Sequence, residues 1–356
     1  MVISDKRIDF FDYLRALAVS LVALTHYRNS FMPGGSIGVS IFFCLSGYLI
    51  TTILLTEDKL TPRKALAFML RRFMRVFPAY LCALATMLAL MTLAHSNREP
   101  LLLAALPGLL TFTQMPQQWI GMETGVFWTL HVEFWFYILM PILLLAFGKG
   151  RALLVSVLVL ILISYAFKFP PMFHISVPQI WPIAPLLFWM DNLFYGSIVA
   201  ILYFHRKLRL PGAVRLPVIL TSLVVLVFVA MNISAANGRT VWPSLSTGAS
   251  LLAATLIAVY LSNDAELPAF PRWVWLGTFI AWIGRISYSI YLLHGIPLDY
   301  RNILTKPLFN LSQVGILLLA AASYYFVEKP GIRLGRNLTK YLLPAAKKAV
   351  QVAKHA

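Results

Sequence analysis

Apolar stretches of membrane-spanning length alternate with short polar connections along almost the whole chain. A helix needs ~20 predominantly apolar residues to cross the hydrocarbon core of a bilayer. Ten stretches approach this length: 10–27, 37–56, 73–93, 127–147, 152–167, 183–204, 216–231, 245–261, 276–296 and 308–327. The pattern therefore predicts an all-α integral membrane protein with about ten transmembrane helices.

A further apolar stretch, 101–112, is short and contains Pro107 and Gly108. A span, a re-entrant segment and an interfacial helix are all compatible with it. The positive-inside rule favours leaving it out of the count, because most Lys and Arg residues then lie on the cytoplasmic side. An additional span would move the basic connection 206–215 and the basic C-terminal tail outside. We therefore expect the N- and C-termini to be cytoplasmic.

Composition excludes several other classes of protein. Hydrophobic residues make up 60% of the chain and charged residues 12%, which does not suit a water-soluble domain. The net charge of +17 does not indicate nucleic-acid binding, because the basic residues lie between apolar segments. Cys44 and Cys82 lie within apolar stretches and do not indicate a disulfide framework. We expect a transmembrane domain over residues 1–332 and a basic cytoplasmic tail over residues 333–356.

The first predicted span carries three residues that are costly in a bilayer: Asp12, Arg15 and His26. Arg15 and His26 are eleven positions apart, which at about 100° per residue places them on nearly the same helix face, ~16 Å apart along the axis. One alternative is that Arg15 reaches the inner headgroups beside Asp12 while His26 marks the outer end of the helix. The other is that both side chains line a functional site.

The fourth predicted span contains Glu133 close to its outer end, followed at once by aromatic residues. A carboxylate in this setting needs an internal partner or a water-filled cavity, so we interpret it as functional, with Trp128 and Tyr137 as supporting residues. His131 and Glu133 do not share a helix face, so they do not indicate a metal pair, and no metal site is expected. In the second span, Ser46 by itself is typical of close helix packing, and it is also a candidate substrate-contacting or supporting residue.

Two groups of polar residues follow from the predicted topology. His26, Glu133 and His294 come from three spans and all fall in the outer half of the membrane, where they suit general-base chemistry. Arginines gather in the inner half and suit either phosphate binding or anchoring to anionic lipid. They are Arg15, Arg71, Arg72, Arg75 and Arg285, and Tyr288 and Tyr291 share the ninth span with Arg285 and His294.

At these residues the chain resembles the membrane-bound acyltransferase 3 family, whose members modify surface carbohydrates in bacteria. The likeness rests on six motifs in order: Asp12-x-x-Arg15 with His26, Gly38-Val39-x-x-Phe42-Phe43-x-x-Ser46-Gly47, Arg72-x-x-Arg75 with Pro78, Trp128-Thr129-Leu130-x-x-Glu133-x-x-Phe136-Tyr137, Ser287-Tyr288 with Tyr291 and His294, and Glu328-Lys329-Pro330. Ser40 stands where the family often has an acidic residue, and Thr129 where it usually has serine. The resemblance implies ten core helices in the bacterial cytoplasmic (inner) membrane.

The resemblance implies an O-acyltransferase that uses cytoplasmic acyl-CoA, most simply acetyl-CoA, as donor. Its phosphates are expected near the arginines and its thioester beside His26, which removes a proton from an acceptor hydroxyl. Glu133 is expected to orient His26 or the acceptor, with His294 as an auxiliary partner and Tyr288 steadying the oxyanion. An acyl-histidine intermediate is the alternative to direct transfer. The expected acceptor is an extracytoplasmic carbohydrate such as lipopolysaccharide O-antigen, capsule, exopolysaccharide or peptidoglycan.

The leading rival function is a transporter or flippase of a glycan or lipid-linked precursor. In it, Arg15, Glu133 and the two histidines form a proton relay. Against this rival, the sequence contains no visible inverted repeat and no pair of broken helices. A scaffolding role leaves Glu133 and the spacing of Arg15 and His26 unexplained.

Overall fold

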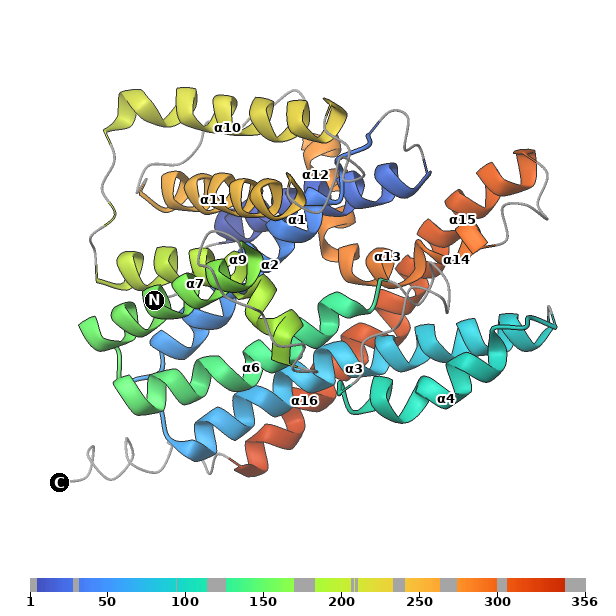
Figure 1. Ribbon diagram of the computed structural model, residues 1–356, viewed down its shortest axis with the longest axis horizontal. Helices are drawn as coiled ribbons and strands as arrows, with labels where there is room; N and C mark the ends of the chain where they lie inside the picture. The colour runs from blue at the N-terminus through green and yellow to red at the C-terminus, as the bar shows by residue number, and fades with distance from the viewer. Residues whose placement is uncertain are drawn as a thin grey trace.

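The computed structural model describes residues 5–27, 32–93, 95–113, 126–169, 183–205, 208, 211–232, 241–262, 274–299 and 306–342, and all elements within these ranges are helices. In chain order they are α1 (Asp5–Tyr27), α2 (Ile37–Leu55), α3 (Pro62–Leu93), α4 (Glu99–Leu110), α6 (Trp128–Phe147), α7 (Arg151–Lys168), α9 (Ile183–Phe204), α10 (Gly212–Asn232), α11 (Val241–Leu261), α12 (Val274–Arg285), α13 (Ser287–Leu293), α14 (Ile296–Asp299), α15 (Lys306–Ser323), the π-helical turn η4 (Tyr324–Glu328) and α16 (Lys329–Leu342). Most of them run roughly along the long axis of the molecule (Figure 1).

The helices correspond to the apolar pattern of the sequence. Within the described residues, eight helices are long and apolar enough to cross a membrane, and the bent pair α12–α13 raises this to nine. Helix α1, which carries Asp12, Arg15 and His26, is not among them but coincides with the predicted span 10–27. The prediction of an all-α, multi-pass membrane protein is therefore confirmed. The ambiguous stretch 101–112 forms α4, a short apolar helix beside α3 (Figure 1).

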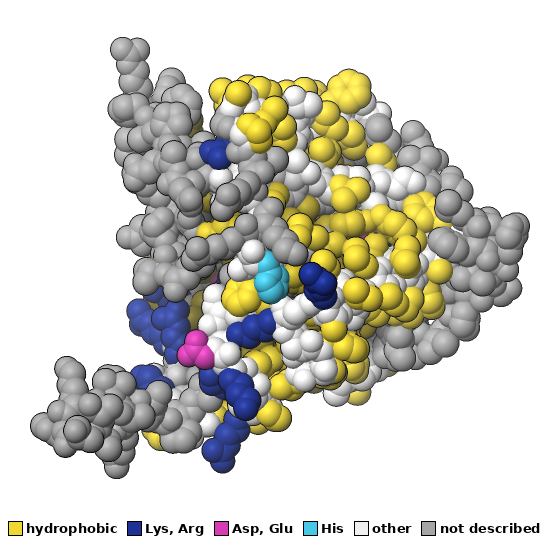
Figure 2. Space-filling view, turned by 90° about the vertical axis from the view of Figure 1, so that its left-hand side faces the viewer, with side chains coloured by type: hydrophobic (Ala, Val, Ile, Leu, Met, Phe, Trp, Pro, Cys, Tyr) yellow, Lys and Arg dark blue, Asp and Glu magenta, His cyan; other side chains and the backbone are white. Residues whose placement is uncertain are grey.

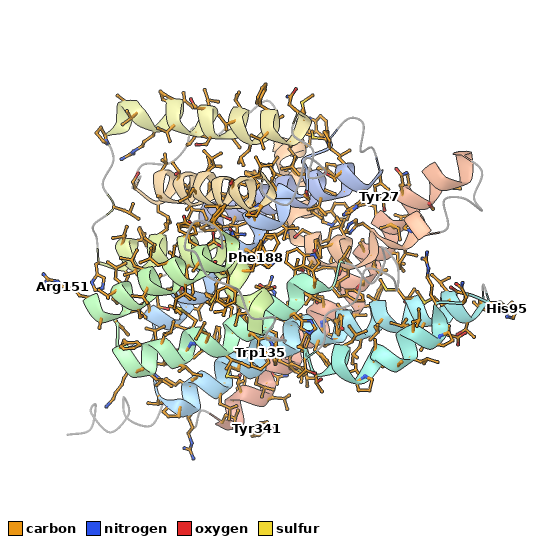
Figure 3. All side chains as sticks on the ribbon, viewed as in Figure 1. Tyr27, His95, Trp135, Arg151, Phe188 and Tyr341 are labelled. Carbon is orange, nitrogen blue, oxygen red and sulfur yellow. The ribbon has the colours of Figure 1, made fainter. Side chains whose placement is uncertain are left out.

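Three connections meet at one end of the bundle. The Lys149 ammonium, between α6 and α7, donates to the carbonyls of Glu57 and Asp58, between α2 and α3. His205, just after α9, lies 2.7 Å from the Lys149 carbonyl through its Nε2 atom. Lys and Arg side chains gather on this face of the molecule (Figure 2), at the end where Arg151 is labelled in Figure 3. The basic connections thus share an end, as the charge pattern predicts.

Helices α1, α6 and α13 meet at the opposite end. The Tyr27 hydroxyl donates to the His294 carbonyl at 2.6 Å, which ties the end of α1 to the end of α13. The Tyr291 hydroxyl donates to the Val126 carbonyl at 3.0 Å, which ties α13 to the start of α6. These bonds give the three helix ends a common depth in the bundle.

Helix α2 is the centre of the bundle, and it packs against α1, α6, α9 and α11. Its contact with α9 is close because each helix offers a glycine to the other. A Cβ atom on Gly47 would lie 1.8 Å from the Leu193 carbonyl oxygen, and one on Gly196 would lie 1.9 Å from the Cys44 carbonyl oxygen. Small residues of this kind allow the backbones of membrane helices to touch. The α2–α9 pair is therefore a fixed frame for the side chains around it.

The ninth predicted span is bent by 56° between α12 and α13. Helix α12 lies against α1, and at their crossing a Cβ atom on Gly284 would lie 1.9 Å from the Asp12 carbonyl oxygen. Only glycine fits this approach. The break places Arg285, the last residue of α12, beside the first turn of α13.

The C-terminal helices run on without a gap from α15 through η4 into α16. Helix α16 packs along α3, where a Cβ atom on Gly331 would lie 2.5 Å from the Met74 carbonyl oxygen. A Cβ atom on Gly335 would lie 3.3 Å from the Cα atom of Arg71. The helix begins at Lys329 and thus crosses the boundary expected between residues 332 and 333.

Candidate functional site

A cavity with an empty volume of about 920 Å³ opens between α1, α2, α3, α6, α12 and α13. One wall is the apolar face of α2, which includes Phe42, Phe43 and Leu49. The other walls are mostly polar. Nine residues that the sequence singled out line the cavity: Arg15, Ser46, Arg72, Arg75, Glu133, Tyr137, Arg285, Tyr288 and Tyr291. Thr129 and Ser287 also line it.

The cavity is electropositive because four arginines and one carboxylate, Glu133, line it. Arg15 donates to the buried Asp12 carboxylate at 2.8 Å, one turn earlier on α1, and its side chain keeps 20% of its surface exposed. Arg75 lies close enough to both Arg15 and Arg72 for the three charges to repel one another. Such a group of cations in a partly enclosed site favours an anionic ligand.

The buried Glu328 balances part of this charge from outside the cavity. It interacts electrostatically with Arg75 and Arg15, and the Ser289 hydroxyl lies 3.4 Å from its Oε2 atom. Glu328 is the last residue of η4, and π-helical turns in α-helices are frequent at functional sites. The motif Glu328-Lys329-Pro330 was visible in the sequence, but its closeness to the arginines was not.

Glu133 belongs to the arginine side of the cavity. The Ser46 hydroxyl donates to its Oε1 atom at 2.5 Å, and Tyr137, one turn later on α6, interacts with it electrostatically. Arg72 interacts electrostatically with both Glu133 and Tyr137. Ser46, interpreted from the sequence as a packing residue, is therefore a hydrogen-bond partner of the carboxylate.

His26 and His294 form a pair at the far end of α1 and α13. Their ring centroids are 5.1 Å apart, and the His294 ring is 5.6 Å from the Tyr291 ring, which lines the cavity. The pair thus adjoins the cavity wall. The structure brings these two histidines together and places Glu133 with Ser46, Arg72 and Tyr137 instead.

The histidine pair has a defined proton arrangement. His294 Nδ1 lies 2.7 Å from the Tyr291 carbonyl oxygen, which can only accept a hydrogen bond, so Nδ1 carries the proton. In its neutral form His294 then presents a lone pair at Nε2, which has no hydrogen-bond partner among the described residues. His294 is buried, whereas His26 is only partly buried. His26 is therefore the more accessible imidazole.

Besides Asp12 and the histidine pair, three of the predicted or candidate residues are not part of the cavity lining. The Cα atom of Arg71 lies against Gly335 of α16. His131 is buried and packs edge-on against Phe112 at 5.6 Å between ring centroids. Trp128 packs against Trp189, with ring centroids 4.7 Å apart.

Two tyrosines of α13 line the cavity while their hydroxyl protons are engaged elsewhere. The Tyr288 hydroxyl donates to the Val76 carbonyl at 2.8 Å, and the Tyr291 hydroxyl donates to the Val126 carbonyl. Both bonds fix α13 against its neighbours. In this arrangement Tyr288 does not present its proton to the cavity, in contrast to the oxyanion role expected from the sequence.

Within the described part of the chain, no group of three or more His, Cys, Asp or Glu side chains is placed to hold a metal ion. The site combines a basic cavity, one carboxylate and a pair of imidazoles beside its wall. This combination suits the transfer of a group from a phosphorylated carrier. The arginines can bind the phosphates of the carrier, and an imidazole can accept a proton.

Comparison with known proteins identifies the family. A family model described as an acyltransferase domain (Acyl_transf_3) matches residues 8–327. The chain belongs to this acyltransferase family. The match includes every residue of the cavity and both histidines of the pair.

Two curated relatives of this acyltransferase-family chain show how far the likeness extends. It is 28% identical to the peptidoglycan O-acetyltransferase OatA of Listeria monocytogenes over 365 aligned residues, covering 92% of this chain and 56% of that protein. It is 27% identical to nodulation protein 10 of Rhizobium leguminosarum bv. viciae over 378 residues, covering 94% and 96% of the two proteins. The chain thus spans about half the length of the Listeria protein. No solved structure matches the chain.

Proposed function

We propose that the protein is a membrane O-acyltransferase that moves an acyl group, acetyl in the first place, from cytoplasmic acyl-CoA to a hydroxyl group of an extracytoplasmic carbohydrate. The observation that carries this proposal is the arginine-lined cavity that adjoins the His26–His294 pair. Membership of the acyltransferase family supports the reaction class. We further propose ten spans with both termini cytoplasmic, in the bacterial inner membrane.

The donor's phosphates bind to the arginines in this proposal. Arg72 and Arg75 are one turn apart on α3, and Arg15 and Arg285 reach the same cavity from α1 and α12. Guanidinium groups bind phosphate through paired, charge-assisted hydrogen bonds. The pantetheine arm then extends along the apolar wall of α2 toward Tyr291 and the histidine pair. Arg71 is left out of this proposal because it does not line the cavity.

His26 is the general base of the proposed reaction, and His294 orients it. The unpartnered Nε2 lone pair of His294 lies beside the His26 ring, and in the proposed reaction it accepts a hydrogen bond from one His26 nitrogen once the rings turn toward each other, which leaves the other nitrogen as a base. That nitrogen removes the proton of the acceptor hydroxyl, whose oxygen attacks the thioester carbonyl. The carbon–sulfur bond breaks, the CoA thiolate leaves, and His26 returns the proton to the sulfur.

Glu133 serves the donor side in this proposal. The sequence suggested that it orients His26 or the acceptor, but its hydrogen-bond partner is Ser46 and its electrostatic neighbours are Arg72 and Tyr137. A carboxylate held by a serine hydroxyl fixes the direction of the Arg72 guanidinium. We therefore propose that Glu133 positions Arg72 for the donor phosphates.

The proposed acceptor is a cell-surface polysaccharide, since the name of the Listeria relative is that of a peptidoglycan O-acetyltransferase. O-antigen, capsule, exopolysaccharide and peptidoglycan all present secondary and primary hydroxyl groups of suitable chemistry. Analysis of the labelled product in the experiment below separates them.

The experiment follows transfer of labelled acetyl groups from acetyl-CoA into surface glycan by membranes that contain wild-type protein or His26→Ala at matched abundance. His205→Ala is the matched control, because His205 lies at the opposite end of the bundle and hydrogen-bonds the Lys149 carbonyl. We expect incorporation by wild type and His205→Ala only. Full transfer by a well-folded His26→Ala protein would overturn the assignment of the base.

The rival function of transport is tested with the same protein in liposomes. A flippase or transporter moves its substrate across the bilayer without an acyl donor, whereas the proposed acyltransferase requires acetyl-CoA for any product. Substrate movement without donor, together with no labelled product, would favour the transporter.

A further inference from the structure

A dense polar cluster lies outside the cavity, in the interior between α7, α9 and α11. The Lys168 ammonium is 2.7 Å from Asp191 Oδ1 and hydrogen-bonds to Thr247 at 3.0 Å and Ser246 at 3.3 Å. The Lys168 and Asp191 side chains have no exposed surface. Charged groups within membrane spans are costly and are usually kept for a function. The reaction proposed above makes no use of this cluster.

The same ammonium group lies against aromatic rings. Lys168 Nζ is 5.5 Å from the centroid of Trp189 and 5.6 Å from that of Phe188. Cations at this distance are attracted to the electron-rich face of an indole ring. The buried ammonium group therefore stabilises the orientation of the Trp189 ring. The location of Phe188, at the centre of the bundle, is labelled in Figure 3.

Trp189 connects the polar cluster with the cavity. Its ring packs on Trp128 at 4.7 Å with 39° between the planes, and both rings contact Phe43, at 6.2 Å and 5.8 Å. Phe43 lines the cavity, and so does Thr129, which follows Trp128 in the chain. Both tryptophans are only partly buried. Two large, partly exposed aromatic side chains, supported by a buried cation, thus pack against Phe43 in the wall of the cavity.

We propose that Trp128 and Trp189 form the binding subsite for the acceptor, with a sugar ring stacked on the tryptophan pair and Lys168 as the positioning residue behind it. This inference rests on the proposed function in naming the saccharide as the acceptor. A pyranose ring has an apolar face of C–H groups, and their partial positive charge complements the negative face of an indole ring. The hydroxyl groups at the edge of the sugar then point toward the cavity.

The expected effect of each tryptophan follows from the strength of aromatic contacts. The loss of one platform ring is therefore expected to weaken saccharide binding roughly three- to tenfold. Donor binding is unaffected, because the arginines lie on other walls of the cavity. The predicted signature is a raised acceptor KM with an unchanged acetyl-CoA KM.

The experiment measures saccharide binding without any acyl donor. Purified protein in lipid nanodiscs is dialysed to equilibrium against radiolabelled chitotetraose and, separately, cellotetraose. The variants are Trp189→Leu, Trp128→Leu and Trp189→Phe, the last of which retains a smaller ring and the local packing. Trp275→Leu is the matched control, since Trp275 is 67% exposed on α12.

The subsite is supported if either saccharide binds at least threefold more weakly to Trp189→Leu and to Trp128→Leu than to wild type. Trp189→Phe is then expected to weaken binding less, and Trp275→Leu to leave it unchanged. Absence of binding to wild type, or equal binding by all variants, overturns it. The two proposals fail separately. Tryptophan-dependent binding without acetyl transfer refutes the acyltransferase function alone, whereas normal transfer with an unchanged acceptor KM in Trp189→Leu refutes the subsite alone.

Discussion

Replacement of Lys168 by methionine tests whether the buried ion pair holds α7, α9 and α11 together. Methionine keeps most of the length of the side chain and removes its charge. Asp191 is then left fully buried with hydrogen bonds from Thr247 at 2.8 Å and Ser164 at 3.1 Å, but with no cation. The variant therefore exposes the cost of an uncompensated carboxylate in the interior of the bundle.

The magnitude follows from the burial of the pair. Removal of one partner of a fully buried ion pair destabilises a protein by about 3–5 kcal/mol, because the remaining charge is neither solvated nor paired. At about 2 °C per kcal/mol for a chain of this size, the melting temperature falls by roughly 6–10 °C. The double variant Lys168→Met with Asp191→Leu removes both charges. Its free energy of unfolding is expected to fall by no more than about 2 kcal/mol.

The assay is thermal unfolding of purified protein in one detergent, with unfolding in mixed micelles as a second measure of the free energy. Lys64→Met is the matched control, because the Lys64–Glu57 pair has a similar separation of 3.0 Å but both side chains are 32% exposed. The Lys64→Met variant is expected to lose less than about 1 kcal/mol of its free energy of unfolding. A Lys168→Met protein that is as stable as the double variant or the Lys64→Met control would refute the reasoning.

Two further predictions concern the cavity and the helix frame. Arg72→Ala is expected to raise the acetyl-CoA KM at least about tenfold through the loss of a charge-assisted contact, while Arg71→Ala changes it less than about twofold. If Arg72→Ala and Arg71→Ala changed the acetyl-CoA KM equally, the proposal that Arg72 binds the donor phosphates would be wrong. Gly47→Ala places a Cβ atom 1.8 Å from the Leu193 carbonyl oxygen. We therefore expect the free energy of unfolding to fall by about 3 kcal/mol or more. Gly315→Ala, which meets nothing within 4 Å, is the control, and a Gly47→Ala protein of wild-type stability would contradict the predicted overlap.

The sequence by itself determined the class of fold. A bilayer leaves backbone amides without water, so apolar segments of about 20 residues must form helices. The ten predicted stretches coincide with helices or with the bent pair α12–α13, and the basic connections around Lys149 and His205 share an end. Depth along a helix also follows from residue number, which is why His26 and His294 were expected at one level.

The tertiary structure decided which side chains meet. Rotation of a helix about its axis depends on its neighbours, and close approaches such as those at Gly47 and Gly284 set that rotation. For this reason Glu133 meets Ser46 and Arg72, although the sequence placed it in the outer half of the membrane with His26 and His294.

The buried Lys168–Asp191 pair is the clearest case of information that the sequence carried only in part. Asp191 lies within the predicted span 183–204, so a costly charge was visible. Lys168 follows directly after the predicted span 152–167, and its side chain turns inward to Asp191. A charge in a span demands a partner, and only the packing of α7 against α9 determines which residue supplies it.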